Sequence, residues 1–337
     1  MKDNDKQTSR MMIRKHKKRR HFFRRFILIL AVLIAAGTTV AAFEMHRLNP
    51  LNHFNNLKTV GGDPSEVKQK AGAFNVLLIG NDERKKNSTA SHTDSMVLIH
   101  VNLNKHTYNL LSIPRDTRVN IGGGVYTKLT SVQYVSQLKN GTKQGIIDAV
   151  QAVSRLTGVP INYYAETNYW GLKDMVDSIG GIDMKLPFRV RLTHPWDKSF
   201  SGKVYEVGTH HFDGKTATEV VHERYSLPGT DYGRQQLQEA ALMAIAKKVM
   251  QPANITKLPA LSRALPQFLT ATNMSSEDML SAALGAKGNF HPEKQIKYRQ
   301  VKGTNARMYD DVLKSYNDQL ILPKEELNVV IEKYFSD

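Results

Sequence analysis

Acidic and basic side chains recur at the ends of apolar segments, where they could bind a metal ion and phosphate. Asp82 follows one apolar run, Asp94 begins the next, and Arg115 follows a third. Two carboxylates with open water positions suit Mg²⁺, and guanidinium groups pair with phosphate oxygens. One interpretation is therefore metal-assisted chemistry on a phosphorylated substrate. The other is that these charges form ordinary ion pairs at strand ends, and spacing alone does not decide between the two.

Further residues suited to such a site come from distant parts of the chain. They are cations, and Arg and Lys suit phosphate oxygens. These residues are Arg84, Lys128, Arg224 and Arg234. For these residues to act together, the fold must bring strand ends and a later helix to one place.

The pattern of apolar residues predicts an α/β domain. Short β-branched runs predict strands, and helical spacing between turn signals predicts helices. Their alternation favours a mixed central sheet sandwiched by helices, an α-β-α arrangement. The predicted strands are 74–80, 95–103, 108–113, 161–165 and 182–186, and the predicted helices are 143–156, 170–179, 216–224, 234–250, 277–286 and 324–334.

The amino-terminal part predicts one transmembrane helix ahead of this domain. Residues 1–25 hold eleven Lys and Arg against two Asp, a local charge of +9. Residues 26–43 carry no charge and would span roughly 27 Å as a helix, close to the bilayer core of about 30 Å. Because Lys and Arg stay in the cytoplasm, the domain should lie outside the cell. A cleaved signal peptide is the alternative, since Val40-Ala41-Ala42 offers small residues.

These features divide the chain into four parts. We expect a cytoplasmic tail at 1–25, a membrane helix at 26–43, an extracellular linker at 44–73 and a catalytic domain at 74–337. The tail explains most of the net charge of +16, so the basic composition indicates an anionic membrane and no nucleic acid. The absence of cysteine excludes thiolate metal sites and disulfides.

Six motifs in sequence order resemble the signature of the LytR-CpsA-Psr family. They are NVLLIGNDER, TDSMVLIHVN, LLSIPRDT, YTKLTSV, GLKDMVDSIGGIDM and DYGRQQLQ, between residues 74 and 250. A short basic tail with a single anchor also matches the family. The resemblance implies a phosphotransferase of a Gram-positive-type cell membrane. It would move a teichoic acid, capsular or secondary wall polysaccharide from a polyprenyl-diphosphate carrier to peptidoglycan and release polyprenyl phosphate.

The same resemblance implies roles for the candidate residues. Asp82 and Asp94 would hold Mg²⁺, or Mn²⁺, and would be catalytic together with Arg115. The diphosphate would contact Arg84, Arg115, Lys128, Arg224 and Arg234, with Gln238 nearby. The general base stays open among Asp82, Asp94 and Asp116. The lipid would lie in an apolar groove between sheet and helices, and its candidate lining residues, for which core packing is the alternative, are Trp170, Leu172, Met175, Leu242, Met243 and Ile245.

Three positions depart from the family pattern. His92, His222 and Leu237 stand where arginines are common, and a neutral histidine replaces a fixed charge only in part. A non-catalytic polyprenyl-phosphate-binding scaffold of envelope assembly is therefore the alternative function. Direct DNA binding is disfavoured, because no helix-turn-helix is evident and the domain is expected outside the cell.

Overall fold

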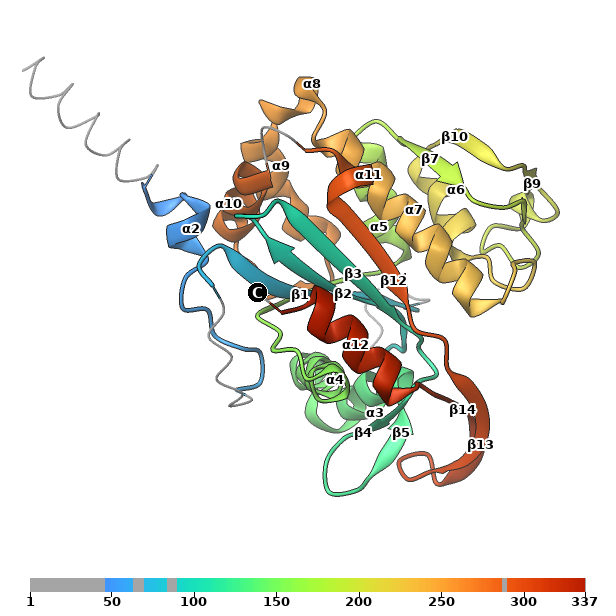
Figure 1. Ribbon diagram of the computed structural model, residues 1–337. Coiled ribbons are helices and arrows are strands. Elements are labelled where there is room, and N and C mark those ends of the chain that lie inside the picture. Colours follow the sequence, from blue (N-terminus) through green and yellow to red (C-terminus); the bar gives the residue numbers. More distant parts are fainter. Residues whose placement is uncertain (1–45, 63–69, 84–89, 287–289, 337) are drawn as a thin grey trace, which may run out of the picture. The chain divides into compact units, whose positions relative to one another are not determined.

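The computed structural model describes residues 46–62, 70–83, 90–286 and 290–336 (Figure 1). The predicted tail at 1–25 and membrane helix at 26–43 lie outside these residues. Within the described ranges, no helix is both long and apolar enough to cross a membrane. One compact unit runs over Pro50–Asp337.

A mixed sheet forms the centre of this unit. In the described part of the chain its strand order is β11-β6-β1-β2-β3-β12. β2 is antiparallel to both β1 and β3, while β6 runs parallel to β1 and β12 parallel to β3. The predicted mixed central sheet is thus confirmed. The strands are β1 (Ala73–Asn81), β2 (Thr93–Asn102), β3 (Thr107–Ile113), β6 (Tyr163–Thr167), β11 (Ala271–Thr272) and β12 (Ile296–Gln300).

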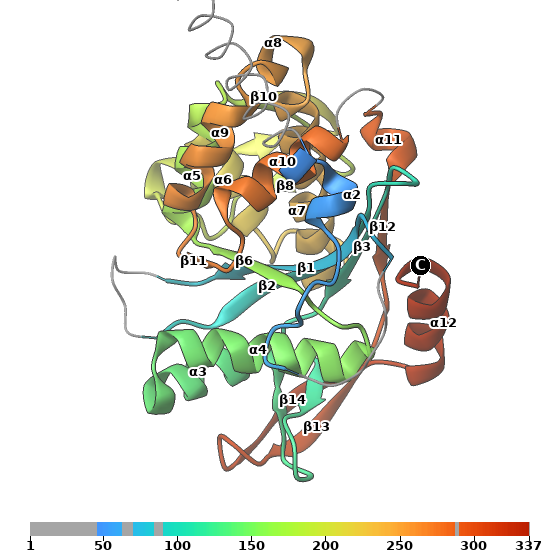
Figure 2. The same cartoon turned by 90° about the vertical axis from the view of Figure 1, so that its left-hand side faces the viewer.

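Helices cover both faces of the sheet, as predicted (Figure 2). Because side chains alternate along a strand, Leu77 and Ile79 of β1 enter one core, whereas Phe74 and Val76 enter the other. The first core is closed by α3 (Leu129–Asn140), α4 (Thr142–Thr157) and α12 (Lys324–Tyr334). The second face is covered by α5 (Tyr169–Ser178), α6 (Gly214–His222), α7 (Asp231–Val249), α9 (Leu258–Ala264) and α10 (Ser276–Ala286).

A third core lies behind α7, against a two-stranded sheet. β7 (Ile182–Leu186) and β10 (Gly208–Phe212) pair antiparallel. Met184 and Phe212 from these strands pack with Val220 of α6 and Leu237 of α7, all of them buried. α7 is therefore packed on two sides, and this fixes the directions in which its remaining side chains point.

Two hairpins and several short elements complete the fold. One hairpin pairs β4 (Arg118–Asn120) with β5 (Tyr126–Lys128), and the other pairs β13 (Thr304–Asp310) with β14 (Ser315–Ile321). The short elements are α2 (Pro50–His53), α8 (Pro252–Ile255), α11 (Pro292–Gln295), β8 (Val190–Arg191), β9 (Val204–Tyr205) and the 3-10 turns Lys198–Phe200 and Leu265–Phe268. Every predicted strand and helix of the domain is present within a few residues of its predicted ends, whereas α3, β12 and both hairpins were not predicted.

Part of the predicted linker at 44–73 packs on the domain. Phe54, which follows α2, is 1% exposed. Its ring stacks on Phe74 with centroids 4.2 Å apart and meets the edge of Tyr163 at 6.2 Å. Aromatic pairs of this kind add to the hydrophobic gain of burial, so the chain ahead of β1 is fastened to the sheet.

We therefore expect Phe54→Ala to lower the free energy of unfolding by about 3–5 kcal/mol, because it empties a buried aromatic site. Thermal or denaturant unfolding of the full chain would measure this loss. Leu138→Ala is the control: this α3 side chain is 59% exposed, and its loss should change stability by less than about 0.5 kcal/mol. Equal effects of the two substitutions would contradict the packing of residue 54.

Candidate active site

An irregularity between β1 and β2 positions Asp94. Gly80 pairs with Ser95 and Asn81 with Thr93, so Asp94 is an extra residue in the ladder. Such a bulge redirects a side chain and is frequent beside functional sites. Asp82 follows the last residue of β1, and its backbone N–H donates to the carbonyl of His92 over 3.0 Å. Both predicted carboxylates therefore lie at the same end of neighbouring strands.

Asp94 joins two arginines that are far apart in the sequence. Its Oδ1 forms an ion pair with Arg115, and its Oδ2 lies 3.7 Å from Nη1 of Arg234. Arg234 is 5% exposed and donates from Nη2 to the backbone carbonyl of Asp94 at 2.7 Å and to Asp231 at 2.6 Å. The structure thus brings together three of the predicted site residues.

The loop after β3 carries Arg115 and connects it to Lys128. Asp116 accepts an ion pair from Lys128 at 3.1 Å and lies 3.7 Å from Nε of Arg115. Burial alone would lower the pKa of Arg115, but attraction to Asp94, Asp116 and Asp231 and the hydrogen bond to Asp94 raise it above its ordinary value. The positive charge of Arg115 is therefore permanent.

The two arginines keep unused donor capacity at this place. Among the described residues, the Nε groups of Arg115 and Arg234 are buried and have no hydrogen-bond acceptor. A buried donor without an acceptor costs free energy, and an anion bound beside these guanidinium groups could recover part of that cost. The pair therefore suits a phosphate.

The remaining predicted residues take different places. Gln238 accepts a hydrogen bond from Ser95 through Oε1 at 2.8 Å, beside Asp94. Arg224 hydrogen-bonds to the Tyr225 hydroxyl at 2.7 Å. Arg84 lies outside the described residues, so its predicted contact stays a prediction.

Two cavities meet at Asp94, Arg234 and His222. One is a groove of about 370 Å³ between the sheet and helices α5 to α7 and α10. The other is a polar pocket of about 320 Å³, whose wall also includes Arg115 and Arg224. The two cavities share the three residues at their junction. A ligand with an apolar chain and an anionic head would fit across it.

The groove matches the predicted lipid site in most of its lining. Leu172, Met175, Leu242 and Ile245 line it, as predicted. The prediction was wrong for two residues. Met243 lines another cavity, because successive residues of α7 point in different directions. Trp170 packs instead against Trp196, with ring centroids 6.2 Å apart.

Comparisons with known proteins identify the family of the chain. The sequence profile of the LytR-CpsA-Psr family matches residues 38–332. The chain belongs to the LytR-CpsA-Psr family. It is 29% identical over 249 residues to the polyisoprenyl-teichoic acid–peptidoglycan teichoic acid transferase TagU of Bacillus cereus, over 73% of this chain and 75% of that protein.

Solved structures show the same fold. The crystal structure of Bacillus subtilis TagV is similar with a TM-score of 0.62 and 22% identity, over 78% of this chain and 96% of TagV. TagT bound to LIIa-WTA is similar with a TM-score of 0.59 and 25% identity, over 78% and 89% of the two chains. The predicted family and the predicted mixed central sheet flanked by helices are both confirmed.

His222 stands where the LytR-CpsA-Psr pattern has an arginine, and the structure shows what this histidine contacts. The indole N–H of Trp196 donates to Nε2 of His222 over 2.7 Å. A ring nitrogen that accepts a hydrogen bond carries no proton, so the imidazole is neutral in this arrangement. His222 thus contributes an aromatic, uncharged wall where the family pattern has a cation.

No sequence motif indicated the residues behind this wall. Tyr169 stacks on Trp196 with ring centroids 4.4 Å apart. Glu219, 1% exposed, accepts backbone N–H groups from Trp196 at 2.8 Å and Asp197 at 2.9 Å. This buried carboxylate holds the loop that presents Trp196 to His222.

Glu223 plays a similar positioning role beside the polar pocket. It is 3% exposed and accepts the backbone N–H groups of Thr193 at 2.6 Å and Ser226 at 3.1 Å. Burial would raise its pKa, but these hydrogen bonds lower it below the ordinary value. An ionised Glu223 therefore fixes the loop that carries Arg224.

Of the other two residues that depart from the family pattern, one lies in the core and one lies at the site. Leu237 is fully buried in the core behind α7, so it does not face the phosphate-binding residues and removes no charge from them. His92 does lie at the site. Its ring stacks on Tyr134 at 4.3 Å, and its Nδ1 lies 3.7 Å from Asp82.

Asp82 and Asp94 fit a divalent metal ion in their donor type. Both line the groove at its polar end, and their oxygens are the ligands that Mg²⁺ prefers. In the described ranges, no group of three or more His, Cys, Asp or Glu is arranged so that it could hold a metal ion by itself. A metal held here would therefore complete its shell with water and substrate phosphate, as Mg²⁺ commonly does.

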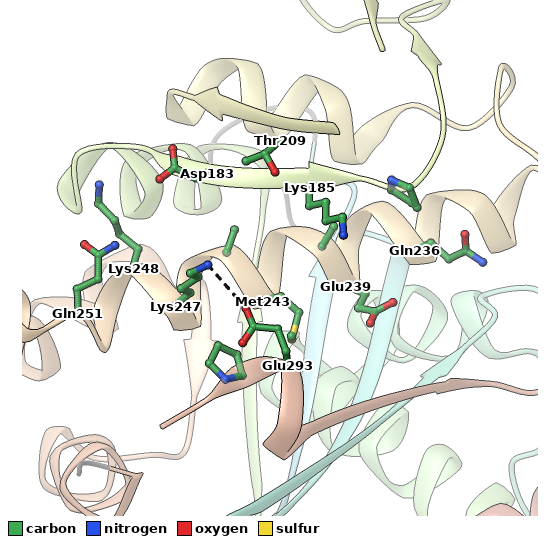
Figure 3. Close-up of a pocket in the computed structure, with 14 residues that line it drawn as sticks. Asp183, Lys185, Thr209, Gln236, Glu239, Met243, Lys247, Lys248, Gln251 and Glu293 are labelled. Atoms are coloured by element: carbon green, nitrogen blue, oxygen red, sulfur yellow. Dashed lines mark ion pairs between the residues drawn. The ribbon is translucent and has the colours of Figure 1, made fainter. Parts of the chain in front are cut away.

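A further cavity of about 360 Å³ lies on the other side of α7 (Figure 3). Glu239 and Lys185 line it near one end, and Lys247 pairs with Glu293 across it at 3.7 Å. In the part of the chain that the structure describes, the carboxylate of Glu239 has no hydrogen bond or ion pair. Burial raises its pKa to about 7.

This raised pKa predicts a pH-dependent stability. Between pH 4.5 and about 7, the folded state keeps a proton on Glu239 that the unfolded chain has lost, so stability falls as pH rises. Glu239→Gln should remove this decline and stabilise the protein at pH 8 by about 1–3 kcal/mol. Unfolding measured from pH 5 to 8 tests this prediction.

The control is Glu293→Gln, at an exposed residue of the same cavity, which should leave the slope of stability against pH unchanged. An unaltered slope in Glu239→Gln would contradict the assignment.

Proposed function

We propose that the chain transfers a glycopolymer from a polyprenyl-diphosphate carrier to peptidoglycan and releases polyprenyl phosphate. The observation that carries this proposal is the meeting of an apolar groove and a cationic pocket at Asp94 and Arg234. The donor has the same two parts, an apolar chain joined to a diphosphate and its polymer. The transferase name of the TagU relative supports the reaction and favours a teichoic acid as the polymer.

The location follows from the substrates and the amino-terminal sequence. The donor lipid resides in the membrane, and the acceptor lies outside it. The basic tail and apolar run at 1–43 match a single-pass anchor with the amino terminus in the cytoplasm. The domain would then meet both substrates at the outer surface of the cell membrane.

In the reaction, the prenyl chain lies in the groove and the diphosphate lies in the polar pocket, beside Arg115 and Arg234. A wall-sugar hydroxyl attacks the sugar-proximal phosphorus in line with the bridging oxygen. The new O–P bond forms as the bond from phosphorus to the bridging oxygen breaks, and that oxygen leaves with polyprenyl phosphate. The hydroxyl proton passes to a carboxylate of the site, which is Asp82, Asp94 or Asp116. The guanidinium groups stabilise negative charge as it develops on the leaving phosphate.

We assign Asp82 and Asp94 as the ligands of Mg²⁺ or Mn²⁺. When bound, such an ion supplies positive charge for the leaving phosphate. The protein's own part is to hold these two carboxylates at adjacent strand ends.

A non-catalytic lipid-binding scaffold is the second candidate. The observation that favours it is the neutral His222 at a position where the family pattern has a cation. Such a scaffold would bind the donor without releasing prenyl phosphate.

Removal of a cation or of a carboxylate should strongly slow transfer. Arg115→Ala and Asp82→Ala should each lower kcat by about 10²–10³, because each removes stabilisation of the transition-state charge. The assay follows polyprenyl phosphate release by the full chain in detergent micelles. It contains a lipid-diphosphate-linked saccharide, peptidoglycan fragments and Mg²⁺.

Arg189→Ala is the control, since Arg189 pairs with Glu206 on an exposed surface. Tight donor binding without release, with two different donors, would establish the scaffold instead.

The lipid groove makes a separate prediction. Leu242→Asp puts a charge into the groove, so KM for a long-chain donor should rise about 10-fold or more, because burying an unpaired charge is costly. A donor with a short prenyl chain should be affected far less. Met243→Asp is the matched control, because Met243 is the next residue but faces the cavity of Figure 3. An equal loss with both donors would contradict the groove as the lipid site.

A further inference from the structure

Two hairpins extend from the domain beside the candidate active site. The β4–β5 and β13–β14 hairpins, residues 118–128 and 304–321, lie next to each other. Figure 2 shows β13 and β14 reaching beyond α3 and α4. Asp311 and Tyr126 join the hairpins through backbone hydrogen bonding, with N–H of Asp311 donating to the Tyr126 carbonyl at 2.9 Å. We call this pair of hairpins the hairpin arm.

The hairpin arm is fastened to the loop that carries Arg115. The backbone N–H of Leu320 donates to the carbonyl of Asp116 over 2.8 Å. Asp310, fully buried, accepts from the Thr127 hydroxyl at 2.9 Å and from the backbone N–H of Lys128 at 3.3 Å. The hairpin arm and the cationic residues of the site are thus held by the same hydrogen bonds.

The hairpin arm exposes aromatic rings near the β13–β14 turn. Tyr309 and Tyr316 face each other across β13 and β14, with ring centroids 5.3 Å apart, and are 40% and 64% exposed. Arg118 donates to the carbonyl of Tyr309 at 3.0 Å and lies 4.5 Å from the ring centre of Tyr126, which is 37% exposed. Leu313, in the turn, is 43% exposed. Tyrosine and arginine gathered on an exposed surface are typical of binding sites.

We propose that the hairpin arm is the docking surface for the acceptor glycan strand. This inference rests on the proposed transferase function, because that reaction needs an acceptor beside the diphosphate. Sugar rings have C–H faces that pack on tyrosine rings, and their hydroxyls hydrogen-bond to tyrosine and arginine. A repeating glycan contacts several such groups at once, so weak contacts add along the strand.

Continuity with the site selects the glycan over other occupants. Tyr126 precedes Lys128 by two residues on β5, a distance of roughly 7 Å along the strand. A glycan strand bound to the exposed tyrosine rings therefore reaches the cationic residues of the site with one of its hydroxyls. A membrane surface fits less well. The four cations of the hairpin arm are accompanied by three carboxylates, whereas anionic lipid attracts clustered basic residues.

The test is binding of the full chain, in detergent micelles, to cell-wall sacculi stripped of teichoic acid. The double substitution Tyr309→Ala/Tyr316→Ala should weaken co-sedimentation about 10-fold, as loss of interface tyrosines commonly does. In the transfer assay it should raise KM for the acceptor and leave KM for the donor unchanged. The thermal unfolding temperature should stay near that of the unaltered chain, since both rings are exposed. Tyr309→Phe/Tyr316→Phe is the matched control, because it keeps the ring faces and should retain most binding.

The outcomes separate this proposal from the proposed function. Loss of sacculus binding in the alanine variant supports docking even if the unaltered chain releases no prenyl phosphate. Unchanged binding in that variant, or no binding by the unaltered chain, overturns docking and leaves the transferase assay standing. Binding to anionic phospholipid vesicles that the alanine variant loses, with sacculus binding intact, would identify a membrane surface and also overturn it.

Discussion

The ion pairs of Asp94 with Arg115 and Arg234 connect the parts of the molecule on which the site depends. Asp94 comes from a bulge in β2, Arg115 from the loop after β3, and Arg234 from the first turn of α7. Two guanidinium groups placed together repel each other, and Arg234 is almost fully buried. A buried charge without a counter-charge is strongly destabilising. The carboxylate between them therefore lets the protein hold both cations ready before any substrate arrives.

Helix α7 then links this charged centre to the apolar groove. Arg234, Gln238, Leu242 and Ile245 line the groove and recur at three- and four-residue spacing, which places them on one side of the helix. Leu237 instead enters the core behind the helix. One rigid helix thus fixes the depth of the lipid relative to the phosphate-binding arginines. Binding energy from a long apolar chain can in this way hold the reacting phosphorus in place.

The sequence predicted the layered fold and the clustering of charge at strand ends because both are local. Apolar alternation and helical spacing reveal β1 and α7, and Asp82 and Arg115 come within two residues of strand ends. The elements that the sequence did not predict depend on tertiary contacts. β12 contains Lys297 and Arg299 and becomes a strand by pairing with β3. α3 is rich in Ser, Thr and Gln, and it is held by burial of Leu129 and Val132.

Within the site, the same limit applies to individual residues. The bulge at Asp94 appears only in the pairing register, which a single strand does not reveal. Trp196 comes from an irregular loop, and only the buried Glu219 behind it places the indole against His222. Leu237 is the opposite case. Because it lies in the same motif as Arg234, the sequence predicted that it replaces an arginine of the site. In the structure its side chain points into the core behind α7. Sequence proximity identified the motif, and helix geometry decided which of its residues face the substrate.

The balance of charge at the site supports the proposed divalent ion. The described cations are Arg115, Lys128, Arg224 and Arg234, and the described carboxylates are Asp82, Asp94, Asp116, Glu223 and Asp231. Each of these cations except Arg224 already has a carboxylate within ion-pair distance, and His222 adds no charge in its hydrogen-bonded form. A diphosphate brings one ionised oxygen on each phosphate, so its arrival adds negative charge to a site that has no surplus of positive charge. Arg84 would offset part of it, and a divalent ion on Asp82 and Asp94 would supply the rest. Electrostatic interactions strengthen where water is excluded. The need for added positive charge is therefore greatest at the buried junction of the pocket and the lipid groove, where the phosphorus must lie.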